Sequence, residues 1–119
     1  MTSVADYMIV ADDQFHTGVV EVFFQVKPRP NYDPGSRVVL SFIAGTNNAV
    51  PGLQFPVSFA VMINNKVVLE YSTDAPLFAQ TMHEVIEAGL IKKGLNEIIF
   101  SSTPHMIFSD VVLLIGAFV

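Results

Sequence analysis

The side chains best suited to metal binding or acid–base catalysis are spread thinly over this sequence. The three histidines, His16, His83 and His105, lie far apart and lack the close spacing of zinc ligands on a helix or finger. No nucleophile elbow, glycine-rich phosphate loop or kinase signature is present. We therefore expect no catalytic residues, no bound metal at these histidines and a protein that is not an enzyme.

One acidic pair, Asp12 and Asp13, stands out among the carboxylates. Calcium ions favour clustered carboxylate and carbonyl oxygens, but the other acidic residues are dispersed along the chain and specify no such cluster. Solvated turn residues are the favoured interpretation of this pair. Asp110, next to the last apolar segment, is expected to have a structural role in a turn or an ion pair.

The composition excludes several classes of protein. The chain has 119 residues, a net charge of -5 and no cysteine, so disulfides and thiolate sites are excluded. Only Lys92 and Lys93 are adjacent basic residues, which gives no positive surface for nucleic acid. No apolar segment reaches the roughly 20 residues of a membrane helix. The N-terminus lacks the features of a signal peptide, so we expect a cytoplasmic protein unless a leader was removed.

Several segments carry apolar side chains at every second position, which is the pattern of half-buried strands. Val20, Val22, Phe24 and Val26 share one face, and residues 38–42 and 57–63 repeat the pattern. Further strands are expected at 7–11, 66–72, 96–101 and 107–119, with loops at 27–35 and 45–52. About eight short strands predict an all-β fold, a single antiparallel β-sandwich spanning residues 1–119.

Two segments between these strands are informative. Asn64 and Asn65 tolerate the positive φ angles that a two-residue hairpin turn requires, so they are expected to connect two strands. Residues 73–93 are ambiguous, because Leu77, Met82 and Ile86 lie close to helical spacing. A short helix within residues 75–88 is therefore one interpretation.

Residues 59–68 (FAVMINNKVV) and 89–100 (GLIKKGLNEIIF) resemble the galactose-binding-domain-like jelly rolls found as carbohydrate-binding modules and accessory domains of glycosidases and polysaccharide lyases. In those domains a strand ends in a turn similar to "vNGk", and a later "lLkxGxNxIxF" motif precedes the penultimate strand. The resemblance implies a jelly-roll-like sandwich with a strand at 80–86 and a saccharide ligand. Related domains often hold a structural calcium ion, but the carboxylates here are too dispersed to specify a site, so no cofactor is predicted. Asn65 replaces the usual glycine, and the chain has no tryptophan to stack on a sugar.

Antiparallel strands would place the loops alternately at the two ends of the sandwich. One end would collect residues 13–17, 45–54, 73–76 and 103–105, and the other 29–35, 64–65 and 92–93. The first end carries donors and acceptors able to bind a polyhydroxylated ligand. Tyr32 and Phe55 are the candidate stacking surfaces of the module. We predict a lectin-like, non-catalytic binding module. Its predicted ligand-binding residues are His16, Asn47, Asn48, Gln54, Asp74 and His105.

The apolar character of the chain supports a second hypothesis. Residues 111–115 lack alternation, so both faces of this strand are expected to be covered. Charged residues make up only 14% of the chain, against roughly 25% in an average domain. Exposed apolar patches usually mark interfaces, so a self-associating homo-oligomer, a structural or assembly protein, is the alternative.

Overall fold

The computed structural model describes residues 2–18 and 21–119, and every regular element in this part of the chain is a β-strand. The all-β prediction is confirmed, although Val20 of one predicted strand lies outside the described residues. The strands are β1 (Ser3–Ala11), β2 (Phe15–Thr17), β3 (Val22–Val26), β4 (Val38–Thr46), β5 (Val57–Ile63), β6 (Lys66–Thr73), β7 (Gln80–Ile86), β8 (Asn96–Ser102) and β9 (Met106–Phe118).

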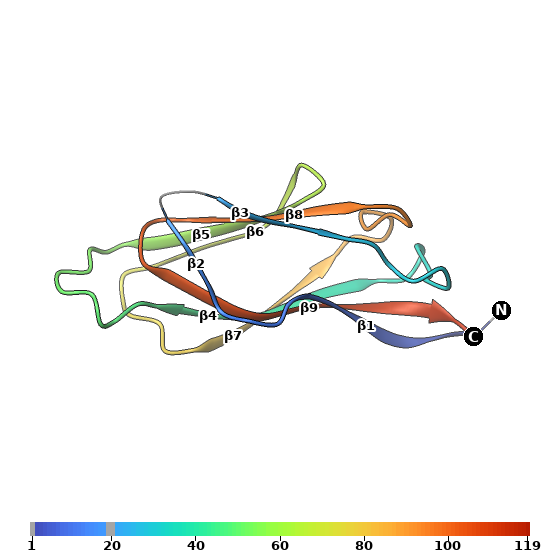
Figure 1. Cartoon of the computed structure of the whole chain (residues 1–119), viewed down its shortest axis with the longest axis horizontal. Helices are drawn as coiled ribbons and strands as arrows, with labels where there is room; N and C mark the ends of the chain where they lie inside the picture. Colours follow the sequence, from blue (N-terminus) through green and yellow to red (C-terminus); the bar gives the residue numbers. More distant parts are fainter. Residues whose placement is uncertain (1, 19–20) are drawn as a thin grey trace.

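The strands form two antiparallel sheets that face each other (Figure 1). Sheet A has the order β1-β9-β4-β7, and sheet B has the order β3-β8-β5-β6. β2 pairs with residues 106–108 at the start of β9, and β1 pairs with residues 111–118 of the same strand. If β1 and β2 count as one interrupted strand, the pairs nest as first with eighth, second with seventh, third with sixth and fourth with fifth. This is jelly-roll connectivity, and the predicted jelly-roll-like sandwich is confirmed.

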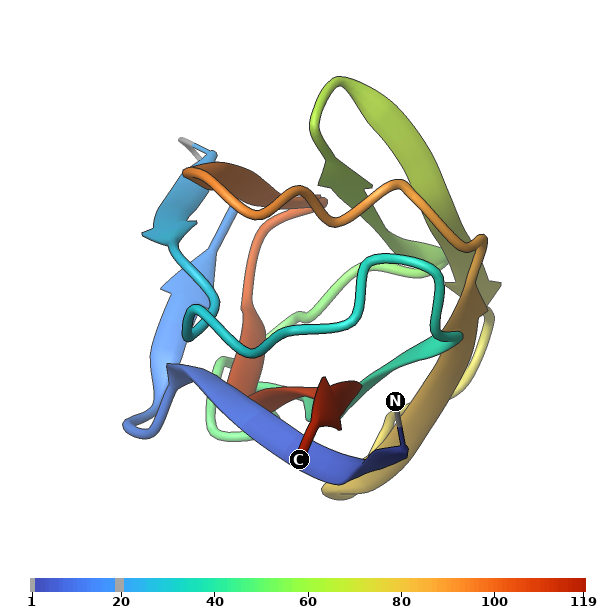
Figure 2. The same cartoon turned by 90° about the vertical axis from the view of Figure 1, so that its right-hand side faces the viewer.

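The core lies between the sheets and is rich in phenylalanine. β4 alternates strictly, so that Leu40 and Phe42 are buried and the residues between them face outward. Phe100 of β8 and Phe108 of β9 lie opposite each other, with ring centroids 5.0 Å apart. Looking along the long axis, Figure 2 shows the chain closing round this interior, with both termini at the viewer's end.

Residues 13–17, expected as a loop, contain the strand β2. Phe15 is partly buried and packs edge-on against Phe24 and Phe100, with ring centroids 5.0 and 5.2 Å apart, and Thr17 is buried. His16 lies between them and faces solvent. Burying the Phe15 ring requires this alternation, so the segment pairs with β9 instead of remaining a loop.

Residues 80–86 form β7, as the resemblance implied, and the alternative of a helix within 75–88 is wrong. Met82 and Ile86 face the core at even positions, while Leu77 belongs to the preceding loop. The apparent helical spacing therefore combined residues of two different elements. The Asn64–Asn65 turn is confirmed, since both residues have positive φ angles of 50° and 67°.

A β-bulge at Asp110 corrects the phase of β9. Ser41 and Ile43 of β4 pair with Val112 and Ser109, so β9 has one residue more than its partner here. Asp110 is the extra residue, and it has a positive φ of 52°. The bulge lets Phe108 and Val111 both face the core. Leu114 faces outward and is 44% exposed. The described chain therefore leaves this face open, and β9 is not a central strand between two layers of core. Cover of this face by a partner subunit stays a prediction.

Candidate functional site

Three loops gather at the end of the sandwich opposite the termini, as the sequence predicted (Figure 1). They are the β4–β5 loop (47–56), the β6–β7 loop (74–79) and the β8–β9 turn (103–105). The Asn47 N–H donates to the His105 carbonyl oxygen at 2.7 Å, and the Thr46 N–H donates to the Leu77 carbonyl oxygen at 3.1 Å. These main-chain bonds fix the loops relative to one another. We call this region the loop end.

Thr46, the last residue of β4, holds two of these loops together with its side chain. It is buried, and its Oγ1 donates to Asn48 Oδ1 at 2.6 Å while accepting the Leu77 N–H at 3.0 Å. Asn48 Nδ2 in turn points to the Leu77 carbonyl oxygen at 3.4 Å. The Asn48 amide is thus held in a defined orientation, which suits a residue that recognises a ligand.

The first pocket of the loop end, the Phe78 pocket, has a volume of about 370 Å³. It lies on the outer face of sheet A, where Gly45 of β4 pairs with Ile107 of β9 and Ile107 pairs with His16 of β2. Its volume falls at the lower end of the range for small-molecule sites, about 300–1,000 Å³. The lining residues are Gln14, Ile43, Gly45, Thr46, Asn48, Leu77, Phe78, Ala79, Ile107 and Ser109.

The second pocket, the His105 pocket, has a volume of about 380 Å³ and is formed by the β4–β5 loop and the β8–β9 turn. His105 has a positive φ of 71°, an uncommon conformation for a residue other than glycine. Strained conformations of this kind cluster at ligand sites. The lining residues are Val50, Pro51, Gly52, Leu53, Gln54, Pro56, Thr103, Pro104 and His105.

Four of the six predicted ligand-binding residues lie in or beside these two pockets. Asn48 lines the Phe78 pocket, and His16 lies beside it through its pairing with Ile107. Gln54 and His105 line the His105 pocket. Asn47 lies between them.

The side chains of the other two predicted residues are directed elsewhere. Asn47 Oδ1 accepts the Ala49 N–H at 3.3 Å, within its own loop. Asp74 is exposed in the β6–β7 loop and lines neither pocket. A single composite site is therefore not formed, although four of the six residues lie in or beside a pocket.

The aromatic residues were assigned less well. Tyr32, predicted as a stacking surface, is fully buried, because its ring fills the opposite end of the core and its hydroxyl donates to the Ile91 carbonyl oxygen. Phe55 is partly exposed beside the His105 pocket. Phe78, which the sequence analysis missed, is 77% exposed on the rim of the Phe78 pocket. The strand predicted at 80–86 already placed Phe78 in the preceding loop, and this loop position was the available signal.

A third, more open hollow of about 650 Å³ lies over sheet B. Its floor consists mainly of short outward side chains on three strands. Ser58 pairs with Ser72, and Ala60 pairs with Ser101 on one side and with the longer Glu70 on the other. Short side chains leave this depression between their neighbours. The sequence analysis missed it, although small residues recur at the outward positions of these strands.

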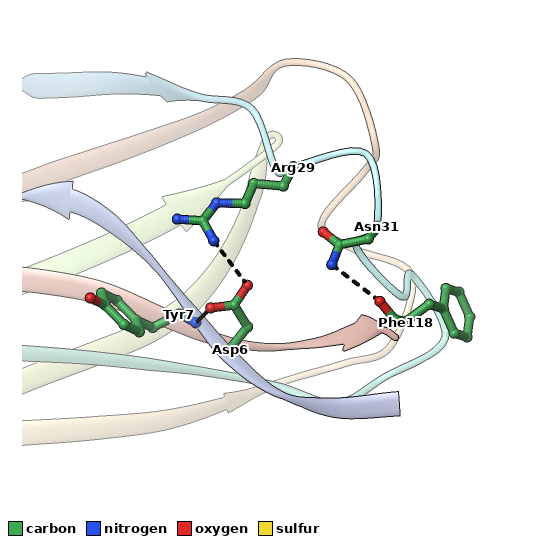
Figure 3. A network of polar contacts seen from close by, with 5 residues as sticks. All are labelled: Asp6, Tyr7, Arg29, Asn31 and Phe118. Atoms are coloured by element: carbon green, nitrogen blue, oxygen red, sulfur yellow. Dashed lines mark hydrogen bonds and ion pairs between the residues drawn. The ribbon is translucent and has the colours of Figure 1, made fainter. Parts of the chain in front are cut away.

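Of the residues that the structure describes, no acidic residue, lysine or arginine lines the Phe78 pocket or the His105 pocket. Among residues 2–18 and 21–119, no group of three or more histidine or acidic side chains could hold a metal ion. Arg29 pairs with Asp6 at 3.7 Å near the termini, where Asn31 Nδ2 also donates to the Phe118 carbonyl oxygen (Figure 3). Within the same residues there is no helix of the length and hydrophobicity needed to cross a membrane.

No protein-family model matches the chain, and no curated protein matches it significantly. Its fold is similar to that of several solved structures. Dimeric latent PorU from Porphyromonas gingivalis has a TM-score of 0.66 and 9% identity, covering 98% of this chain and 13% of that one. The EclA C-terminal domain, a sugar-binding protein, has a TM-score of 0.54 and 8% identity, covering 95% and 79%.

The T13 viral particle of infectious bursal disease virus (IBDV) contains a third similar chain, with a TM-score of 0.53 and 14% identity over 97% of this chain and 31% of that one. The chain described here therefore spans about an eighth of PorU and about a third of the viral protein. At these identities the likeness establishes the fold alone. The molecule is a jelly-roll-like β-sandwich with two pockets at its loop end.

Proposed function

We propose that this chain is a non-catalytic binding module for carbohydrate or another polyhydroxylated ligand, and that the loop end is its binding surface. The observation that carries the proposal is the pair of adjacent pockets, each lined by apolar side chains and a few amide, hydroxyl or imidazole groups. This composition is typical of small-molecule sites. The sugar-binding EclA domain, which shares the fold, lends support.

The polar groups suit hydroxyl ligands. A sugar hydroxyl both donates and accepts hydrogen bonds, and the side-chain amides of Asn48 and Gln54 offer both functions within one group. The imidazole of His105 adds a further donor or acceptor. Because main-chain bonds join the loops to one another and to the end of β4, these groups are pre-positioned and little ordering is needed on binding.

A glycan array probed with the intact chain tests this function. We expect retention of a limited set of saccharides, with Asn48→Ala and His105→Ala each weakening the interaction and Asn65→Ala, in the turn at the opposite end, leaving it unchanged. Uniform failure to bind any glycan, followed by failure to bind other polyols in solution, would reject the proposal.

A second candidate function is self-assembly, and a specific surface favours it. Tyr7, Leu114, Val39 and Val85 are neighbours in register across all four main strands of sheet A. Tyr7, Leu114 and Val85 are 59%, 44% and 60% exposed, so an uncharged apolar row crosses the outer face of this sheet. Such patches mark interfaces in many proteins. The fold's occurrence in the IBDV viral particle lends support.

The oligomeric mass distinguishes the two candidates. If this row is a self-interface, light scattering should report a mass that rises with protein concentration. A constant monomeric mass from micromolar to millimolar protein would reject self-assembly and leave ligand binding as the remaining function.

A further inference from the structure

Phe78 is the most exposed aromatic side chain among the described residues. By contrast, Phe42 of β4 and Phe108 of β9 are buried in the core. Exposing an aromatic side chain to water is unfavourable relative to burying it. An aromatic face left in solvent at the rim of a pocket is available to stack on an apolar ligand surface.

The pocket beneath Phe78 combines an apolar floor with a small number of neutral polar groups. Ile43 and Ile107 form the floor from the outer face of sheet A, and Gly45 leaves it open. Gln14, Asn48 and Ser109 contribute two amides and a hydroxyl around this floor. An apolar surface bordered by amides matches a sugar ring, which has a C–H face and a rim of hydroxyl groups.

The backbone around Gly45 determines where Phe78 lies. A Cβ atom at Gly45 would come within 3.4 Å of the Ala79 main-chain nitrogen, so the β6–β7 loop closely approaches β4 here. Ala79 has a positive φ of 49°, a left-handed conformation that is strained for alanine. The hydrogen bonds between Thr46 and Leu77 hold this strained segment in place. Phe78 is thus carried on an anchored loop.

The electrostatics of the pocket restrict its ligand. None of the residues that line it is charged. Asp12 and Asp13 are close in sequence to Gln14, and Asp110 follows Ser109; all three carboxylates are exposed. Consecutive Cα atoms are about 3.8 Å apart, and the Debye length at physiological salt is about 8 Å, so carboxylates adjacent to lining residues disfavour an anion at this site. A neutral ligand fits this site better than an anionic one.

From these observations we propose that the Phe78 pocket binds a single pyranose ring of an uncharged saccharide, with Phe78 stacked on its C–H face and Asn48 and Gln14 hydrogen-bonded to its hydroxyls. This inference rests on the proposed function and specifies its site and substrate class. It also predicts discrimination against sugars that carry a carboxylate, a sulfate or a phosphate.

The test is titration of the intact chain with methyl glycosides of neutral hexoses and with the matching methyl glucuronides. Phe78→Ala and Phe78→Trp are compared with Phe55→Ala, which removes a partly exposed phenylalanine beside the His105 pocket. We expect Phe78→Ala to weaken binding on the order of tenfold, Phe78→Trp to retain it, and Phe55→Ala to change it less than twofold. The neutral glycosides should bind more tightly than the glucuronides.

The outcomes separate this inference from the function on which it rests. Wild-type affinity in Phe78→Ala, or a loss confined to Phe55→Ala, would overturn the Phe78 site while leaving saccharide binding intact. Equal or tighter binding of the glucuronides would overturn the neutral-ligand assignment. No binding of any glycoside by the wild type would contradict the proposed function itself. Unchanged melting temperatures of the variants confirm that they fold.

Discussion

The Tyr32 hydroxyl donates a hydrogen bond to the Ile91 main-chain carbonyl oxygen at a distance of 2.9 Å. Both side chains are fully buried, and the bond joins the β3–β4 loop to the β7–β8 loop across the end of the core opposite the pockets. Tyr32 also forms an isolated bridge with Ala117 of β9. This residue therefore ties together three segments that are distant in sequence.

Replacing Tyr32 by phenylalanine should lower the free energy of unfolding by about 1–2 kcal/mol. The variant keeps the buried ring and loses only the donor, so the Ile91 carbonyl oxygen is left without this partner. Urea unfolding at neutral pH measures the difference. Saccharide affinity should not change, because Tyr32 lies at the other end. An unaltered unfolding midpoint would show that the hydrogen bond contributes no net stability.

The same residue predicts a loss of stability in alkali. Burial, and secondarily the charge of Asp33, raise the pKa of Tyr32 above its ordinary value of 10.0. Above about pH 10 the unfolded chain releases this proton while the folded chain retains it, so the stability present below pH 10 falls as the pH rises. Melting temperatures between pH 8 and 11 should drop less steeply in Tyr32→Phe. Identical slopes in the two proteins would contradict this account.

Asn96 should be among the polar residues most sensitive to substitution. It is buried, its Oδ1 accepts the Lys92 N–H at 2.7 Å and Asn64 Nδ2 at 2.9 Å, and its Nδ2 donates to the Lys92 carbonyl oxygen at 2.9 Å. Asn96→Ala breaks all three bonds, and we expect a loss of about 2–4 kcal/mol in the free energy of unfolding.

The neighbouring turn offers a matched control for Asn96. Asn65 is exposed with a φ of 67°, a conformation that glycine adopts without strain, so Asn65→Gly should change stability by less than about 0.5 kcal/mol. Chemical denaturation of both variants makes the comparison. Equal effects of the two substitutions would mean that the Asn96 bonds are not what stabilises this end.

A large side chain at Gly45 should block the Phe78 pocket. The β6–β7 loop approaches Gly45 too closely for a side chain such as leucine to fit without entering the pocket or displacing Ala79. We expect Gly45→Leu to reduce saccharide affinity at least tenfold, as measured by calorimetric titration. Gly94→Leu is the matched control, because the space around Gly94 is open and lies at the other end. Full affinity in Gly45→Leu would place the ligand elsewhere.

A charge in the apolar row of sheet A should abolish any self-association. Leu114 lies at the centre of this row, between Tyr7 and Val39, and burying a lysine there without a partner costs several kcal/mol. Leu114→Lys should therefore be monomeric at concentrations where the wild type associates, as sedimentation velocity can measure. Glu70→Lys, a charge change on the outer face of sheet B, should associate as the wild type does.

The features of the fold that were predicted correctly depend on residues close to one another in the sequence. The alternation in β4 and β5, the Asn64–Asn65 turn and the sorting of loops to two ends all follow from strand periodicity and antiparallel pairing. Four of the six predicted site residues lie in or beside a pocket for the same reason. Ligand binding by them stays a prediction.

What the sequence did not reveal depends on contacts between distant segments. β2 forms because Phe15 has three aromatic neighbours on other strands, and Tyr32 is buried because two remote loops close over it. The bulge at Asp110 responds to the register with β4. The exposure of Phe78 depends on how its loop meets Gly45. None of these is visible in a window of adjacent residues.

The first and last strands pair with each other, with Ser3 opposite Phe118, so both ends of the chain leave the sandwich on the same side (Figure 2). The molecule is elongated, 54 Å by 22 Å by 22 Å, and the pockets lie at the far end of its long axis. A tether or a solid support joined to either terminus would therefore leave the surface of the loop end directed away from the attachment. Immobilisation through a terminal tag should leave that surface accessible.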